Sequence, residues 1–152
     1  MPPAFFPQTP DQWPQWLDNT ALALRRALLD HPDGARGVAL GADLRRATAL
    51  GGFFERTIVV LHEAGFGLPE ASRATGSFIA FVIGRTAEEQ SLPDLDFDPG
   101  SDFARPADLV ARMPVFTRAM TERFTAGESP EESFRFSVGI LIAGLQAMRT
   151  AR

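Results

Sequence analysis

The chain has 152 residues, of which 45% are hydrophobic and 22% charged, a composition typical of one globular domain. The absence of cysteine excludes disulfides, thiolate metal sites and cysteine nucleophiles. The 15 basic residues, all arginine, are outweighed by 19 acidic residues, and this net charge of −4 argues against DNA binding by the chain itself. With no membrane-length apolar run and no secretory signal pattern, we expect a cytoplasmic protein without membrane contact.

The N-terminal part predicts a lead-in segment over residues 1–8 and then one domain over residues 9–152. Three prolines keep the first eight residues extended. The sequence Thr-Pro-Asp-Gln from Thr9 has the order of a capping box with proline at the first helical position, so a helix is predicted to begin there. It ends near His31, before a Pro-Asp-Gly turn. Its apolar stripe consists of Leu17, Ala21, Leu24 and Leu28.

Three further helices are expected in the middle of the chain. A weak helix of one or two turns, limited by glycines, is predicted over 35–40. A long helix is predicted over 44–64, where Gly65-Phe66-Gly67 supplies a stop. The next begins at Leu68-Pro69-Glu70 and runs to about Gln90, with apolar residues beyond its main stripe, which predicts that it is covered on two sides.

The C-terminal third begins with a loop predicted over 91–105, which is rich in Asp, Pro and Gly. One or two short helices are expected between Pro106 and Phe124, interrupted near Pro114. The last helix starts at a second capping box, Ser-Pro-Glu-Glu from Ser129. It carries one apolar stripe of Phe134, Val138, Leu141, Leu145 and Met148, and small residues among them that allow another helix to approach closely. Since no segment alternates with period two, the fold class is all-α.

Several segments, taken in order, resemble the C-terminal domain of TetR-family transcriptional repressors, tetracycline repressors among them. The resemblance implies a helical bundle and a homodimer, in which the helix ending at Gln90 and the last helix form a four-helix bundle with their mates. The segments that carry it are Trp16-Leu17, LRRALL from Leu24, His31, DGAR from Asp33, AGF from Ala64, FVIG from Phe81, EEQ from Glu88 and FSVGILIAGL from Phe136.

Repressors of this family begin with a three-helix DNA-binding headpiece, and nothing before Trp13 supplies one. We therefore expect DNA to be bound only through a headpiece that is not in this chain. One interpretation is the excised effector-sensing and dimerising domain of a repressor. A second is a headless helical protein that binds a small molecule or pairs with an intact repressor. A third is a structural module with a filled core and no effector.

The resemblance also implies an effector pocket between the first helix and the two longest central helices, for a small apolar or aromatic molecule. Carried over residue by residue, and with Phe78 added from the apolar stripe, the candidate ligand-binding residues are Thr20, Leu24, Phe54, Thr57, Ile58, Thr75, Phe78 and Glu88. The alternative is that the apolar members are plain core, and that Thr20 and Thr57 bond back to a carbonyl one turn earlier.

Glu88 matches the acidic residue with which tetracycline-sensing members hold magnesium. Their histidine partner is expected shortly after Ala35, but residues 36–42 contain no histidine. Since magnesium requires several oxygen ligands, we expect neither magnesium nor tetracycline, and no cofactor. The alternative role for Glu88 is a solvated or ion-paired helix end. Because the sequence has no nucleophile elbow, phosphate loop or HExxH motif, we expect no enzyme activity.

Overall fold

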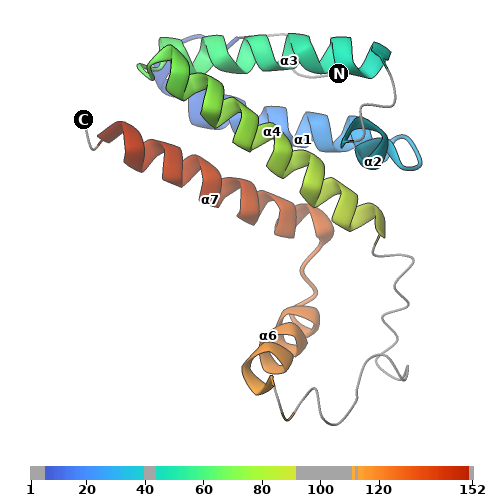
Figure 1. Cartoon of the computed structure of the whole chain (residues 1–152). Coiled ribbons are helices and arrows are strands. Elements are labelled where there is room, and N and C mark those ends of the chain that lie inside the picture. The colour runs from blue at the N-terminus through green and yellow to red at the C-terminus, as the bar shows by residue number, and fades with distance from the viewer. Residues whose placement is uncertain (1–5, 40–43, 92–110, 112, 151–152) are drawn as a thin grey trace.

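A computed structural model describes residues 6–39, 44–91, 111 and 113–150, and no strand occurs among them. The prediction of an all-α fold is confirmed. The elements, shown in Figure 1, are the 3₁₀ turn η1 (Pro10–Gln12) and the helices α1 (Trp13–Leu29), α2 (Gly34–Ala39), α3 (Leu44–Glu63), α4 (Leu68–Ser91), α6 (Pro114–Thr125) and α7 (Pro130–Thr150).

The first helix begins at the predicted capping box. The Gln12 side chain accepts hydrogen bonds from the backbone N–H groups of Gln8 and Thr9, at 3.0 and 3.4 Å. One 3₁₀ turn precedes the regular α-helix, which ends at Leu29, two residues before the predicted end. Of its predicted stripe, Leu24 is only partly buried, while the rest is buried. The lead-in prediction lies partly outside the described residues.

The turn between α3 and α4 is closed by the predicted glycine. Gly65 has φ +101°, a conformation that L side chains rarely adopt. Its N–H donates to the His62 carbonyl at 2.9 Å, and the N–H of Phe66 donates to the Leu61 carbonyl at 3.1 Å. These two bonds form the Schellman motif that ends many helices. The ring of Phe66 then packs edge-on against Trp13, with ring centroids 5.6 Å apart, which anchors the turn on α1.

Helix α4 is the centre of the fold, since it packs against α1, α2, α3 and α7. In Figure 1 it runs diagonally across α1 and lies between α3 and α7. This confirms that α4 is covered on two sides. The core cluster draws on all the long helices, and its largest fully buried side chains include Trp13, Phe78, Phe134, Leu17 and Leu61.

The last helix buries a different set of residues from the predicted stripe. Phe134, Val138 and Ile142 are buried. Leu141 and Leu145 are partly buried, and the side chain of Met148 is 50% exposed. The five residues of the predicted stripe are therefore not all buried within the chain, because α7 is apolar on more than one side and only one side meets α1 and α4.

The segment before α7 matches the prediction where the structure describes it. The predicted loop over 91–105 and the residues 106–113 before α6 lie almost entirely outside the described residues. Pro114 is the first residue of α6, as expected of a proline that cannot continue a helix. The second capping box is confirmed, since Glu132 accepts from the Ser129 N–H at 2.8 Å while its own N–H donates to the Ser129 hydroxyl at 3.2 Å.

Candidate functional site

Seven of the eight predicted site residues, which lie on α1, α3 and α4, are buried or pack against the hydrophobic core cluster. Thr20, Thr57, Thr75 and Phe78 are almost completely buried, with at most 1% of their surface exposed. The other three, Leu24, Phe54 and Ile58, are partly buried and pack against the same core cluster. The structure thus brings residues from all three helices to one apolar region.

The threonine hydroxyls in this region differ in their hydrogen bonds. Thr57 donates to the Phe53 carbonyl one turn earlier, at 2.9 Å, as its alternative structural role predicted. The hydroxyls of Thr20 and Thr75 have no hydrogen-bond partner within the described part of the chain. Thr20 therefore lacks the back-bond that was considered for it. Two unpaired polar groups lie in an apolar core.

Glu88 does not lie with the other predicted residues. Its side chain is 64% exposed and forms an ion pair with Arg85 on the surface of α4. Over the ranges that the structure describes, no three His, Cys, Asp or Glu side chains are placed together to hold a metal ion. The carboxylate at the position that matches the family's magnesium-holding residue is thus engaged by a guanidinium.

A buried ion pair, which the sequence analysis missed, connects three helices. The Arg25 guanidinium on α1 donates to both Glu89 oxygens on α4, at 2.8 and 2.5 Å, and its side chain is 8% exposed. It also lies 3.6 Å from a Glu131 oxygen and 5.5 Å from the centre of the Phe134 ring on α7. The hydrogen bond with Glu89 raises the pKa of Arg25, against the opposing effect of burial. The signal available in the sequence was that Arg25 lies four residues after Ala21, and so on the same face of the first helix as part of its apolar stripe.

The next residue of α4 holds the corner between α1 and α2. The Gln90 amide donates to the carbonyls of Leu28 and His31, at 3.2 and 3.0 Å. Its oxygen accepts from the N–H of Ala35 at 3.2 Å. They add to the bonds of the turn itself, in which the carbonyls of Leu28 and His31 also accept from the backbone N–H groups of His31 and Gly34. The C-terminal end of α4 is therefore fastened to both sides of the α1–α2 corner.

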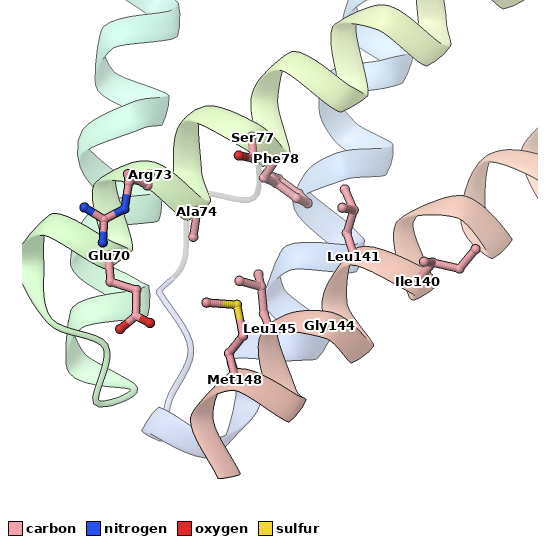
Figure 2. Close-up of a pocket in the computed structure, with 10 residues that line it drawn as sticks. All are labelled: Glu70, Arg73, Ala74, Ser77, Phe78, Ile140, Leu141, Gly144, Leu145 and Met148. Atoms are coloured by element: carbon pink, nitrogen blue, oxygen red, sulfur yellow. The ribbon is translucent and has the colours of Figure 1, made fainter. Parts of the chain in front are cut away.

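An apolar groove of about 340 Å³ lies between α4 and α7. Figure 2 shows side chains of α4 facing those of α7 across it. Of the predicted site residues, Phe78 lines this groove. Its lining consists of Glu70, Arg73, Ala74, Ser77, Phe78, Ile140, Leu141, Gly144, Leu145 and Met148.

Helix α7 also exposes large apolar side chains on and beside the groove. Phe136, Ile140 and Met148 are 70%, 60% and 50% exposed. The small residues Gly139 and Gly144 on the same helix are exposed, and a Cβ atom added to either would meet only open space. This combination leaves a broad apolar face without a covering element in the described chain.

Comparison with known proteins places this arrangement in a family. The family model described as "Tetracyclin repressor-like, C-terminal domain" matches residues 6–149. The chain belongs to this family. As a tetracyclin repressor-like C-terminal domain, it has the helical bundle that the resemblance implied, and no helix among its described residues is long and apolar enough to cross a membrane.

Three relatives from Escherichia coli are similar over almost the whole domain. The class C tetracycline repressor protein is 27% identical over 143 residues, which are 94% of this chain and 63% of the relative. The class E protein is 30% identical over 146 residues, which are 93% of this chain and 61% of the relative. The class A protein from transposon 1721 is 28% identical over 148 residues, which are 94% of this chain and 62% of the relative. The domain thus spans somewhat over three fifths of the length of the relatives it matches.

Proposed function

We propose that this chain is the effector-sensing and dimerising domain of a TetR-type transcriptional repressor. The observation that carries the proposal is the family match along nearly the whole chain, together with the apolar face that α7 leaves uncovered. The relatives are repressor proteins by name. In this proposal DNA is bound by a separate N-terminal headpiece, the protein works in the cytoplasm, and the domain described here catalyses no reaction.

The apolar face of α4 and α7 is proposed to bind a second copy of the chain. Exposed Phe136, Ile140 and Met148 form the kind of contiguous patch that marks an interface rather than ordinary surface. Gly144 lies in the groove between them, where a bulky side chain of a mate fits against the backbone. A two-fold axis through this face pairs α4 and α7 with their mates as a four-helix bundle.

The effector is proposed to bind in the core between α1, α3 and α4. Phe54, Ile58 and Phe78 supply apolar contacts there, and the threonines supply a few polar ones. This is the usual composition of a small-molecule site. The effector is a small apolar or aromatic molecule. Because the Glu88 carboxylate is exposed and paired with Arg85, it is not proposed to bind a metal-bound drug.

Release of DNA is proposed to follow from a shift in helix packing. An effector that binds one arrangement of α1 and α4 more tightly favours that arrangement, with a coupling of about 1–3 kcal/mol in typical cases. The Arg25–Glu89 ion pair and the Gln90 bonds connect α4 to α1 and to its corner with α2. A change in the core is thereby transmitted along α1 towards the headpiece.

A thermal-shift screen of apolar and aromatic compounds tests the effector site. Any ligand that binds the native state selectively raises its apparent stability. We expect a subset of compounds to raise Tm, and the shift to fall in Phe54→Ala. The matched control is Phe116→Ala, which removes an exposed ring on α6, and it is expected to keep the shift. If no compound in a broad panel raises Tm, the interpretation as a structural module replaces this proposal.

A further inference from the structure

Helix α7 has two apolar faces that are alike in composition. The face that packs into the core carries Phe134, Val138 and Ile142. A second face carries Phe136 and Ile140, which are 70% and 60% exposed. The hydrophobic effect depends on the apolar area that is buried and has no direction, so it distinguishes poorly between two faces that each offer a phenylalanine and an isoleucine. Burial alone therefore does not explain which face of α7 turns inwards.

Charged residues form one row along the start of the chain and another along α7. In η1 and α1, three charged residues recur every seven positions, which is close to two helical turns. They are Asp11, Asp18 and Arg25. In α7, three charged residues are separated by four and then fourteen positions, close to one turn and four turns. They are Glu131, Arg135 and Arg149. Each row therefore lies on one side of its helix.

The two rows meet in antiparallel order, and every contact joins opposite charges. The ion pairs are Asp11–Arg149 at 3.5 Å, Asp18–Arg135 at 3.3 Å and Arg25–Glu131 at 3.6 Å. In the parallel order, Asp11 would face Glu131 and Arg25 would face Arg149, so that two of the three contacts would be repulsive. A rotation of α7 that turned its second apolar face inwards would carry its charged row away from α1. We call the three ion pairs the α1–α7 ladder.

We infer that the α1–α7 ladder selects which apolar face of α7 packs into the core and which face is left for a second copy of the chain. Its residues are positioning residues, since exposed ion pairs stabilise a fold only slightly. A small difference nevertheless decides between two packings of nearly equal energy, as charges beside the apolar seam of a coiled coil do. The second half of the inference rests on the proposed function, in which the exposed face of α7 forms the dimer.

Thiol labelling measures which face of α7 is buried, because the chain has no cysteine of its own. Val138→Cys places a probe on α7 at a position that is 0% exposed, and Val60→Cys places one on α3 at a position that is 1% exposed. Since Val138 is buried within the single chain, its exposure does not require dissociation of a dimer. In the otherwise unchanged chain, both thiols are expected to react slowly with an aromatic disulfide reagent such as DTNB.

Asp18→Asn combined with Glu131→Gln breaks the ladder and leaves the bonds between Arg25 and Glu89 in place. In this double variant, the labelling rate of the Val138→Cys thiol is expected to rise about tenfold, because α7 also populates other orientations. The labelling rate of the α3 probe is expected to change by less than about twofold, because the rest of the core stays packed.

The matched control is Glu55→Gln combined with Glu122→Gln. It removes as many negative charges, from exposed positions outside α1 and α7. Both labelling rates are expected to stay unchanged in this control. An equal rise of both probes in the ladder variant would indicate a general loss of stability, and an unchanged Val138→Cys rate would show that apolar contacts alone orient α7. Either result overturns the inference.

Sedimentation equilibrium separates the ladder from the proposed dimer. If the wild type is a dimer, the ladder variant is expected to raise its Kd about tenfold, and the matched control is expected to leave it unchanged. A ladder variant that labels faster on α7 but dimerises as tightly as the wild type overturns the link to the dimer face. A monomeric wild type overturns the proposed dimer, and the labelling rates then still decide whether the ladder orients α7.

Discussion

At the scale of single residues, Arg25 is the polar side chain on which the packing of three helices depends. It is fixed by both oxygens of Glu89 and contacts Glu131 and the Phe134 ring. The cost of burying its charge is met by these partners. Removing one partner therefore leaves an uncompensated charge, whereas an exposed ion pair on this protein contributes little.

We predict that Arg25→Met lowers the free energy of unfolding by about 3 kcal/mol, because Glu89 is left partly buried without its partner. The double variant Arg25→Met with Glu89→Leu is expected to recover most of this loss. Urea unfolding measures both. The matched control is Arg118→Met, which breaks an exposed pair with Glu122 and is expected to change stability by less than about 0.5 kcal/mol. Equal effects of Arg25→Met and Arg118→Met would contradict this role.

The capping box of α7 gives a prediction about pH. The backbone N–H and then the hydroxyl of Ser129 lower the pKa of Glu132 below its ordinary value of 4.5. Because the folded pKa lies below the unfolded one, the stabilisation is present above about pH 4.5 and is lost as pH falls through the folded pKa. We expect Glu132→Gln to reduce the loss of stability between about pH 6 and about pH 3, as followed by urea midpoints. The exposed Glu55→Gln serves as control, and an equal reduction there would refute the assignment.

Single residues also show where sequence patterns suffice and where they do not. The burial of Phe78 was predictable, because it lies on an apolar stripe at helical spacing, whereas Thr20 and Thr57 were named only through the family resemblance. The pairing of Arg25 with Glu89 was not predictable, because the two residues are 64 positions apart and charged residues on a helix are usually solvated. The lack of a partner for Thr20 likewise depends on packing that no local pattern encodes.

At the scale of elements, helix ends were predicted better than helix faces. Caps are local, so the signals at Ser129 and Gly65 placed a start and a stop directly. The buried face of α7 was predicted in part only, because its apolar residues surround much of the helix. Which side is buried depends on the helices that it meets, and these contacts are distant in sequence.

Two glycines in different elements are expected to respond oppositely to alanine. A Cβ at Gly34 would collide with the Leu28 carbonyl oxygen at the α1–α2 corner, so Gly34→Ala is predicted to destabilise the domain. A Cβ at Gly51, in the middle of α3, meets open space, and Gly51→Ala is predicted to stabilise it by about 0.5–1 kcal/mol. Thermal unfolding of the two variants checks this. A gain in stability for Gly34→Ala would mean that the corner is not tightly packed.

At the scale of the whole molecule, α4 packs against other helices on two sides. One side meets α1, α2 and α3, and the effector is proposed to bind there. The other side meets α7 along the open apolar groove. In the proposed function, sensing on one side of α4 and dimerisation on the other are connected through this single helix.

The measurement that tests this account most directly is the mass of the chain in solution, determined by sedimentation equilibrium. Since one chain has a mass of 16.6 kDa, we predict a species of twice that mass at micromolar concentration. Ile140→Glu, which places a charge on the exposed face of α7, is expected to give the monomer. Phe6→Glu, at an exposed apolar residue that does not line the groove, is expected to keep the dimer. A wild-type chain that remains at 16.6 kDa, or a dimer that Ile140→Glu leaves intact, would contradict the account.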